Sequence, residues 1–427
     1  MNIIESTYNA PIECSGGHMF EAFMGDAEAL DMYITGAAGT GKTHGLATHV
    51  NYCITHDINY VVCAYTHRAC NVLRDKLPHN AKVCTLHSYL KKRPTINEHA
   101  VKEKHIETSK QQGQASDKTV IFVDEYSIVG ERDVMSLRDL DPTPKIVWIG
   151  DPHQLPPVDD AESVRPYGEY QQVLTKRWRT GDDSPLQDPL DQLISFIEGA
   201  EPAALIENDK LIRGCDIVDA YKQNPTVILA FTNRRVQDLN SEVQGYTTPV
   251  EGDTVFCPTN RETYTFKPAT GTPQSITVPG NNTLRLGSKY KTLEYLARQG
   301  YSFTDTLCYV FGHQEYNEQK KKLMRAAAAA NQAIPSDKPT EWARANSKTK
   351  LAKDRATAWR AFLAFNNNVV CLDFAHAMTV HKSQGSTYHT VYVDTDDIGV
   401  AANIDYTLYL KLMYVAISRA SCSVITN

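Results

Sequence analysis

Short apolar runs alternate with helical patterns over the first 150 residues of the chain. The runs lie at Met32–Ile34, Tyr60–Tyr65, Lys82–Cys84, Val120–Val123 and Ile146–Ile149. Between them, apolar residues recur at helical spacing, as at Leu46, Val50, Cys53 and Ile54. Short β-rich runs that alternate with helices are typical of a parallel sheet covered by helices. The pattern therefore predicts an α/β domain.

The same alternation returns in the second half of the chain. Thr226–Phe231, Val391–Val393 and Val424–Thr426 predict strands, and Leu408–Ser418 predicts a helix between the last two. The intervening stretch, Glu251–Phe365, begins with short strands and Gly/Pro turns and ends in helix. We therefore predict a second α/β sheet that is interrupted by a mostly separate insertion.

Composition narrows the class of protein. The 427 residues are 42% hydrophobic and 22% charged, which excludes a disordered chain and a disulfide-stabilised mini-protein. At about 150 residues per domain, the length predicts about three domains. No run of about 18 apolar residues occurs, so we expect no membrane span. The ten cysteines form no C-x-x-C pair and residues 1–14 lack the basic region of a signal peptide, which predicts reduced thiols in the cytoplasm.

The charge of the chain is unevenly distributed. The net charge of −6 by itself argues mildly against a nucleic-acid partner. Residues 316–360 hold eleven Lys and Arg but four Asp and Glu, so this segment carries +7 and the rest of the chain −13. Such a run is most often the solvated face of a helix, and the alanines at 326–330 favour helix here.

The first chemical motif is a phosphate-binding loop. It consists of Gly36, Ala37, Ala38, Gly39, Thr40, Gly41, Lys42 and Thr43, which fit G-x-x-x-x-G-K-[ST] in full. An expected strand precedes it and an expected helix follows it, and this context argues against a chance Gly-rich turn. Glycines let backbone N–H groups face phosphate oxygens. We expect Lys42 to reach the β- and γ-phosphates and Thr43 to ligate Mg²⁺.

A second motif, Val120–Glu125, is an apolar strand that ends in two acids. After a phosphate-binding loop, Asp124 is expected to hold Mg²⁺. Glu125 is placed to polarise the attacking water as a general base. Together the two motifs predict a Mg²⁺-dependent nucleoside triphosphatase.

Five further segments resemble motifs of superfamily 1 DNA helicases. They are Trp148–Pro157 (motif III), Leu174–Arg179 (motif IV), Ala230–Asn233 with Asn240 (the opening of the second motor domain), His381–Thr387 (motif V) and Leu412–Ala420 (motif VI). Their order runs through nearly the whole chain and is most similar to the RecD-like branch, in particular to the Dda-like phage helicases. The resemblance implies an α/β fold with two RecA-like P-loop motor domains and two inserted accessory subdomains.

This resemblance implies an ATP-dependent DNA helicase, using ATP and Mg²⁺, that moves 5′ to 3′ along single-stranded DNA and unwinds duplex. The implied boundaries are 1–88 and 118–173 for the first motor domain, 89–117 for a pin subdomain, 174–250 and 366–427 for the second motor domain, and 251–365 for an SH3-like and helical accessory domain. The implied partners are single-stranded DNA, duplex junctions, and a single-strand-binding protein or replisome component. The expected state is a monomer in the cytoplasm, phage-encoded in a bacterial host, with no membrane partner.

The resemblance also implies residue roles around the γ-phosphate. Arg419 and Arg179 would act as arginine fingers from the second motor domain, with Arg177 as the rival candidate to Arg179. Gln154 would sense the γ-phosphate, and Gly385 would lie at the nucleotide. Both fingers would then have to cross a cleft between the motor domains.

Single-stranded DNA is expected across both motor domains. The implied contacts are Thr66, His67 and Arg68 in motif Ia, Thr85 and His87 in motif Ib, and Thr379, His381 and Lys382 in motif V. Hydroxyl, imidazole and ammonium groups suit phosphate contact. Each histidine has an alternative as a surface or hydrogen-bonded structural residue.

The chain departs from the family pattern in two places. Residues 15–20 lack the glutamine that reads adenine, so either His18 substitutes for it or adenine specificity is loose, in which case ATP and GTP would support equal rates. The pin segment lacks the aromatic wedge of its relatives, with Tyr89 just before its start. A histidine or aliphatic wedge, at His105 or Ile106, is therefore a hypothesis that unwinding assays on alanine variants would test.

A second class of function is open on sequence grounds. A non-motor P-loop NTPase, acting as a nucleotide switch or a protein-remodelling factor, would need only one nucleotide domain. A motor needs two halves that move, and the motifs near Gly385 and Arg419 provide the second half. Stimulation of the ATPase rate by single-stranded DNA would distinguish the two classes.

Overall fold

The computed structural model describes most of the chain. It covers residues 15–96, 103–107, 119–157, 164, 170–178, 185–206, 208–246, 250, 253–257, 262–265, 275–278, 282–285, 291–293, 307–311, 313–336 and 339–427. Contacts divide the chain into two compact units. Unit 1 comprises Met1–Lys92, Glu107–Leu239 and His376–Asn427, and unit 2 comprises Arg93–Ile106 and Asn240–Ala375.

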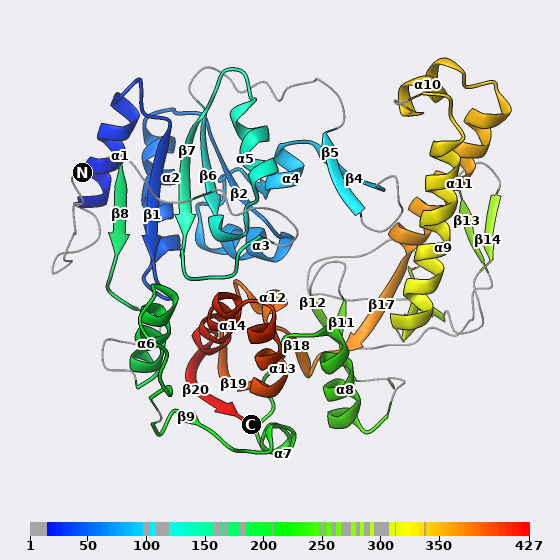
Figure 1. The fold of residues 1–427 in the computed structure, drawn as a ribbon. Coiled ribbons are helices and arrows are strands. Elements are labelled where there is room, and N and C mark those ends of the chain that lie inside the picture. Colours follow the sequence, from blue (N-terminus) through cyan, green and yellow to red (C-terminus); the bar gives the residue numbers. More distant parts are fainter. Residues whose placement is uncertain are drawn as a thin grey trace. The chain divides into compact units, whose positions relative to one another are not determined.

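The first sheet of unit 1 has six parallel strands in the order β3-β2-β6-β7-β1-β8 (Figure 1). The strands are β1 (Asp31–Gly36), β2 (Tyr60–Ala64), β3 (Val83–Thr85), β6 (Val120–Asp124), β7 (Lys145–Gly150) and β8 (Gln171–Leu174). Alternate residues of one strand enter different cores, Phe122 on one face and Ile121 and Val123 on the other. Apolar side chains on both faces are what a helix-covered parallel sheet requires.

Six short helical segments accompany this sheet. They are α1 (Ser15–Gly25), α2 (Lys42–Thr55), α3 (His67–Lys76), α4 (Leu86–Tyr89), the 3₁₀ helix η1 (Tyr126–Ile128) and α5 (Glu131–Arg138). Phe20 of α1 and Leu46 of α2 pack in the same core as Phe122 of β6. Leu137 of α5 packs in the core of the other face. The sheet is therefore covered on both faces.

Unit 1 contains a second parallel sheet, in the order β18-β10-β19-β20-β9. Its strands are β9 (Leu211–Ile212), β10 (Ile228–Ala230), β18 (Ala377–Thr379), β19 (Tyr388–Val393) and β20 (Ala420–Thr426). Its helical segments are α6 (Gln187–Ile197), α7 (Ile217–Gln223), α8 (Asn233–Gln244), α12 (Val380–Ser383), α13 (Thr395–Gly399), η2 (Val400–Asn403) and α14 (Tyr406–Ser418). The predicted α/β class with parallel sheets is confirmed.

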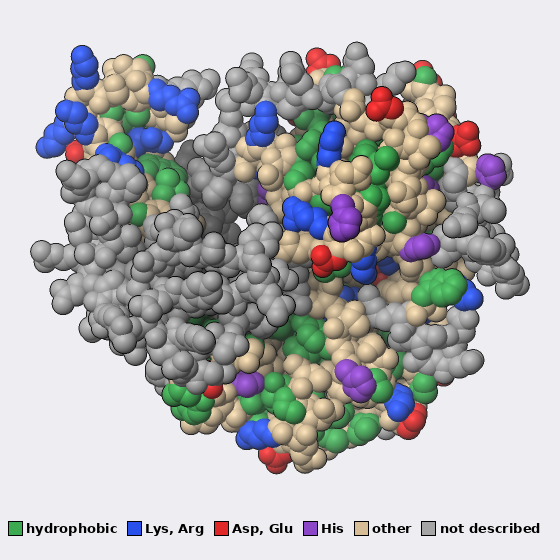
Figure 2. Space-filling model, turned by 180° about the vertical axis from the view of Figure 1, so that it is seen from behind, with side chains coloured by type: hydrophobic (Ala, Val, Ile, Leu, Met, Phe, Trp, Pro, Cys, Tyr) green, Lys and Arg blue, Asp and Glu red, His purple; other side chains and the backbone are tan. Residues whose placement is uncertain are grey.

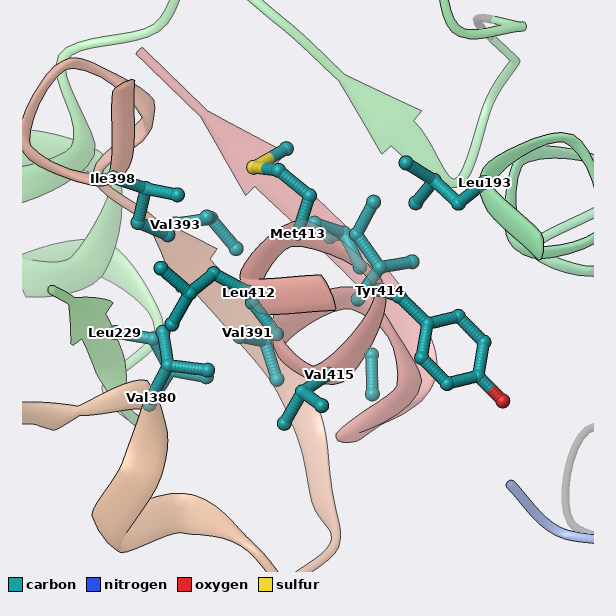
Figure 3. Packing of buried hydrophobic residues seen from close by; sticks show 14 of the residues in the cluster. Leu193, Leu229, Val380, Val391, Val393, Ile398, Leu412, Met413, Tyr414 and Val415 are labelled. Carbon is teal, nitrogen blue, oxygen red and sulfur yellow. The ribbon is translucent and has the colours of Figure 1, made fainter. Parts of the chain in front are cut away.

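The core beside this second sheet is centred on α14. Leu412, Met413 and Val415 of α14 pack with Val391 and Val393 of β19 (Figure 3). Lys411 is also mostly buried, so α14 exposes little of its surface between Leu410 and Ser418. A helix that is buried on nearly every side holds its end residues in fixed positions. Arg419, which directly follows α14, is therefore held in place.

Unit 2 contains a mixed sheet in the order β12-β11-β17-β16-β15. Its strands are β11 (Thr254–Cys257), β12 (Glu262–Thr265), β15 (Lys291–Leu293), β16 (Leu307–Phe311) and β17 (Val369–Phe374). Two-stranded sheets join β13 (Ser275–Val278) to β14 (Asn282–Arg285), and β4 (Lys92–Ile96) to β5 (Glu103–Glu107). The β4–β5 pair lies within the predicted pin segment, but the side chains of His105 and Ile106 are outside the described part, so the wedge stays a hypothesis.

Three helices complete unit 2: α9 (His313–Gln332), α10 (Pro339–Ala345) and α11 (Lys350–Asn368). Tyr316, at the start of α9, contacts Phe365 near the end of α11. Asn331, at the end of α9, accepts a hydrogen bond from Arg355 near the start of α11. The two long helices are therefore antiparallel (Figure 1).

The predicted domain boundaries remain a prediction. In the described parts of the chain, no helix is both long and apolar enough to cross a membrane.

Candidate active site

Three chemical segments meet at the carboxyl edge of the first sheet. The phosphate-binding loop follows β1, Asp124 ends β6, and Gly150 ends β7. Residues of neighbouring strands pair directly, Thr35 with Gly150 and Asp124 with Ile149. Because parallel strands end at one edge, the loop and the acids lie together there.

A cavity of about 530 Å³ opens at this edge. Its size is typical of small-molecule sites, which span about 300–1,000 Å³. The predicted site residues that line it are Ala38, Gly39, Thr40, Gly41, Lys42, Thr43, Asp124, Glu125, Gln154, Gly385 and Arg419. Gly385 and Arg419 follow elements of the second sheet, so both sheets contribute to one cavity.

The loop geometry is that of a phosphate cradle. Gly41 has φ +85°, a left-handed conformation that favours glycine, and α2 begins at the next residue. The Nζ of Lys42 donates to the carbonyl oxygens of Gly36 at 2.6 Å and Ala37 at 2.8 Å. Gly36 and Ala37 thus hold the lysine but are not among the lining residues. The ammonium and the helix N-terminus place positive potential at one point.

Thr43 and Asp124 fit a magnesium ion. Both line the cavity, and a hydroxyl and a carboxylate are the hard oxygen ligands that Mg²⁺ prefers. Burial raises the pKa of the Asp124 carboxyl, against the opposing charge of Lys42. Among the residues described, no group of three or more His, Cys, Asp or Glu could hold a metal.

Glu125 has a constrained backbone beside a glycine of the second sheet. Its φ is +56°, which is uncommon for a residue other than glycine. A Cβ placed on Gly385, whose φ is +76°, would lie 3.3 Å from Glu125 Oε1. Residues held in sparsely populated conformations cluster at functional sites. A side chain at residue 385 would therefore crowd this carboxylate and strain the turn.

Arg419 is buried at the end of α14 and lines the cavity. Its Nε donates to the Val415 carbonyl oxygen at 3.1 Å, and Nη2 donates to Ser418 Oγ at 2.9 Å. Burial lowers the pKa of its guanidinium, against the raising effect of the Glu125 carboxylate. Since arginine stays charged even so, a fixed cation lines the same cavity as the phosphate-binding loop.

Arg177 and Arg179 are the two candidates for the second arginine finger. Arg177 is buried, and its Nη2 forms an ion pair with Asp191 of α6. This ion pair gives Arg177 a structural role. Arg179 lies outside the described residues, so its role as a finger remains a prediction.

Tyr414 connects the two halves of the cavity. It was not predicted as a site residue, although it lies inside the quoted motif VI. The backbone N–H of Ala38 donates to the Tyr414 hydroxyl at 3.0 Å, and that hydroxyl donates to Asp151 Oδ2 at 2.7 Å. Figure 3 shows the ring leaving the apolar core with its hydroxyl directed away from the other labelled residues. One side chain of α14 therefore holds both the phosphate-binding loop and the residue after β7.

Asp151 extends this contact to α6. Its Oδ1 is 3.2 Å from His153 Nδ1, and His153 Nε2 is 3.0 Å from Glu198 Oε1. Burial acts to raise the pKa of Asp151, but the hydrogen bond of His153 and the charge of Lys42 hold it below its usual value. Burial acts to lower the pKa of His153, but Asp151 and Glu198 raise it above the ordinary value. Gln154, the predicted sensor, is buried next to this network.

Several lining residues were not predicted. They are His44, Ala47, Ala69, Val72, Leu73, Lys76, Gly150, Asp151 and Trp178. Asp151 and Trp178 lie inside the quoted motifs III and IV, which is the signal that could have found them. The α3 residues carry no motif, because their place depends on how α3 packs beside α2. The backbone N–H of Trp178 donates to the Gly39 carbonyl oxygen at 2.7 Å.

The three threonines predicted to bind DNA each begin a helix. Thr66, Thr85 and Thr379 accept hydrogen bonds from the backbone N–H groups of Ala69, Ser88 and Lys382 at the starts of α3, α4 and α12. Such N-caps stabilise a helix by about 1 kcal/mol. Thr85 and Thr379 are the last residues of β3 and β18, and Thr66 follows β2, so these motifs lie where a parallel strand leads into a helix. DNA contact by these residues remains a prediction.

The predicted histidines have different surroundings. His87 Nε2 lies 3.3 Å from Asp133 Oδ2, and burial lowers the pKa of His381, which lies beside Phe231. The side chains of His67 and Arg68 are outside the described part. Lys382 is half-buried in α12. His18 is exposed on α1 and is not among the lining residues, so its adenine role stays a prediction.

Comparison with known families agrees with this geometry. Residues 21–160 match the model of an AAA domain, and residues 374–425 match that of a UvrD-like helicase C-terminal domain. An uncharacterized protein, R530 of Acanthamoeba polyphaga mimivirus, is 31% identical over 150 residues, which is 31% of this chain and 30% of that protein. The first match includes the phosphate-binding loop, and the second includes Gly385 and Arg419.

Solved structures of Pif1 helicases are similar over most of the chain. The enzyme from Candida albicans is 15% identical with a TM-score of 0.44, covering 96% of this chain and 93% of that one. The Bacteroides enzyme with ADP-AlF3 and single-stranded DNA is 13% identical with a TM-score of 0.44, covering 98% and 93%.

Proposed function

We propose that the chain is an ATP-dependent DNA helicase that translocates along single-stranded DNA and unwinds duplex. The observation that carries the proposal is a single cavity lined by the phosphate-binding loop of one parallel sheet and by Gly385 and Arg419 of the other. ATP binding and hydrolysis can move the two sheets relative to one another only if both sheets contribute residues to the nucleotide site. A switch or remodelling factor with one nucleotide domain has no need of Arg419 in that cavity.

The residues in the cavity divide the work of phosphoryl transfer. Lys42 and the loop N–H groups would bind the phosphates of ATP. Thr43 and Asp124 would hold Mg²⁺, which neutralises charge on the phosphates when bound. Glu125 would take a proton from the attacking water, and Arg419 would stabilise negative charge on the γ-phosphate. Gln154 would report the γ-phosphate, and Arg179 would act as the second finger.

The finer assignments are part of the proposal. They comprise 5′ to 3′ polarity, closeness to Dda-like helicases and a monomeric state. They also comprise the two motor domains with their accessory insertions, a single-strand-binding or replisome partner, and DNA contacts by motifs Ia, Ib and V. We also propose that His18 recognises the adenine base. Equal ATPase and GTPase rates would contradict this role.

The ATPase rate with and without single-stranded DNA tests the motor directly. We expect strong stimulation of the wild-type protein, and no stimulation would favour the nucleotide switch. Lys42→Ala is expected to retain DNA binding and to lose translocation, because the β- and γ-phosphates lose their cation. Normal unwinding by that variant would refute the loop assignment. Duplexes with either a 5′ or a 3′ single-stranded tail would establish polarity.

A further inference from the structure

The helices of unit 2 carry a concentrated positive surface. It consists of the exposed side chains Lys321, Lys322, Arg325, Arg344, Lys348, Lys350 and Lys353, called here the basic helical surface. Figure 2 shows Lys and Arg gathered in this region of the molecule. The described acidic side chains on these helices are Glu318 and Asp354. The surface therefore keeps a large excess of positive charge.

Packing of the helices does not require these cations. The core between α9 and α11 is apolar and includes Leu323, Met324, Phe362 and Phe365. A different basic residue, Arg355, has the structural role, since it donates to Asn331 and Thr340. The members of the basic helical surface lie outside that core. Lys348 is exposed in the turn between α10 and α11, and the others are exposed on their helices.

Two of these cations occupy positions that destabilise their own helix. Lys350 is the first residue of α11 and Lys353 is in its opening turns, whereas acidic residues are favoured at a helix N-terminus. No acid lies in the first turn of α11. Thr349 caps this helix by accepting from Ala352, so the lysines do not replace a cap. Their placement is therefore better explained by a negatively charged partner than by helix stability.

The aromatic residues of these helices point to the form of that partner. Single strands are usually held by stacking bases on aromatic rings as well as by cations. Here Tyr316 packs on Phe365, with ring centroids 5.4 Å apart, and Trp359 Nε1 donates to Asn331 Oδ1 at 3.0 Å. Those rings are used internally. Trp342 of α10 is half-buried, so the described cations of this surface far outnumber its accessible rings. Such a surface fits the phosphate backbone of a duplex, which carries no accessible base faces.

The dimensions also suit a duplex. Because α9 and α11 are antiparallel, Lys350 lies at one end of the pair and Lys321 near the middle of α9. The two lie about 20 Å apart along the helix axis, at about 1.5 Å per residue. That length corresponds to about six base pairs and their phosphates. We propose that the basic helical surface binds the backbone of duplex DNA without sequence preference. This goes beyond the proposed function, because it assigns unit 2 a DNA contact of its own, separate from the motif residues of unit 1.

Charge reversal in α11 provides the sharpest test. In the double variant Lys350→Glu/Lys353→Glu, we expect blunt duplex DNA to bind at least about tenfold more weakly, with the slope of log affinity against log salt reduced by about two. Stimulation of the ATPase by single-stranded DNA should change less than about twofold. The thermal midpoint should not fall, since glutamate is favoured at this helix N-terminus. Lys321→Glu/Arg325→Glu should repeat the loss of duplex affinity.

A matched control is Lys82→Glu/Lys222→Glu, which changes the net charge equally at exposed positions of unit 1. It should bind duplex like wild type. The proposal is overturned if the α11 variant keeps its duplex affinity and salt slope, if the control loses as much, or if single-strand affinity falls equally. Failure of the proposed motor function would appear separately, as a wild-type ATPase that single-stranded DNA does not stimulate.

Discussion

At the scale of single residues, the chemistry of the site follows from a few side chains with unusual surroundings. Glu125 has a left-handed backbone, Arg419 is buried, and Lys42 donates to two carbonyl oxygens of its own loop. The sequence predicted all three as functional from motif positions. It did not assign a role to Tyr414, although this residue lies in motif VI, because the partner of its hydroxyl, Asp151, is far away in the sequence.

His49 is a second residue with unusual surroundings, and it predicts a pH dependence. It lies on α2, stacked on Phe20 with ring centroids 4.5 Å apart, and neither ring nitrogen has a hydrogen-bond partner among the described residues. Burial lowers its pKa from 6.5 to about 4. Between these values the unfolded chain binds the proton that the folded protein excludes, so stability rises with pH from about 4 to 6.5. The contribution is about 3 kcal/mol, present above pH 6.5 and lost towards pH 4.

His49→Phe removes this titration and the unpaired ring nitrogens together. We expect a higher thermal midpoint at neutral pH and a shallower loss of stability on acidification, because the apolar ring needs no hydrogen bonds. Thermal or urea unfolding at pH 5 and pH 7.5 measures the stability at neutral pH and its loss on acidification. His44→Phe, at an exposed position of the same helix, is the control and should keep the wild-type pH dependence. An unchanged pH dependence in His49→Phe would contradict the assignment.

At the scale of elements, the candidate site residues are concentrated where strands of the two parallel sheets end. The phosphate-binding loop, the acids after β6 and the residues after β7 share one edge. The threonines of motifs Ia, Ib and V cap the helices that follow β2, β3 and β18. Sequence periodicity predicted these strand-to-helix units. It could not predict that α3 would line the cavity with Ala69 and Val72, since that depends on packing between helices.

The turn after α12 tests how closely the two sheets fit. In Gly385→Ala, the new methyl group would lie 3.3 Å from Glu125 Oε1 on a backbone with φ +76°, so the turn or the carboxylate must shift. We expect the turnover number of the ATPase to fall by about tenfold or more, since misplacing a catalytic group is costly. Gly45→Ala is the control, because its added methyl group meets nothing within 4 Å inside α2. Equal turnover in both variants would show that the contact is unimportant.

At the scale of the whole molecule, unit 1 contains two parallel sheets that contribute to one cavity, and unit 2 contains a mixed sheet with a basic helical pair. The net charge of −6 hid this distribution. A motor must release DNA at every step, so a restricted set of cationic positions suits it better than a uniformly basic surface. The AAA-domain and helicase C-terminal matches fall on the parts of the chain that line the cavity.

Cooperation between the two sheets predicts the effect of changing the arginine that links them. Arg419→Lys keeps a positive charge but loses the planar guanidinium, so we expect the turnover number of the DNA-stimulated ATPase to fall by about 100-fold or more. The KM for ATP should change only a few-fold, because the loop that binds the phosphates is intact. Steady-state kinetics measure both constants, with the exposed Arg213→Lys as control. Wild-type turnover would show that one sheet suffices, as in a nucleotide switch.

The sequence by itself determined the local chemistry: the phosphate-binding loop, the acids that end an apolar strand, and the alternation that forms parallel sheets. These are properties of neighbouring residues, whose spacing fixes backbone geometry. Only the tertiary structure decided which distant groups meet. Tyr414 bonds Ala38 across 376 positions of sequence, and Gly385 meets Glu125. Such contacts depend on burial of the α14 core and on the packing of two sheets, which no local pattern encodes.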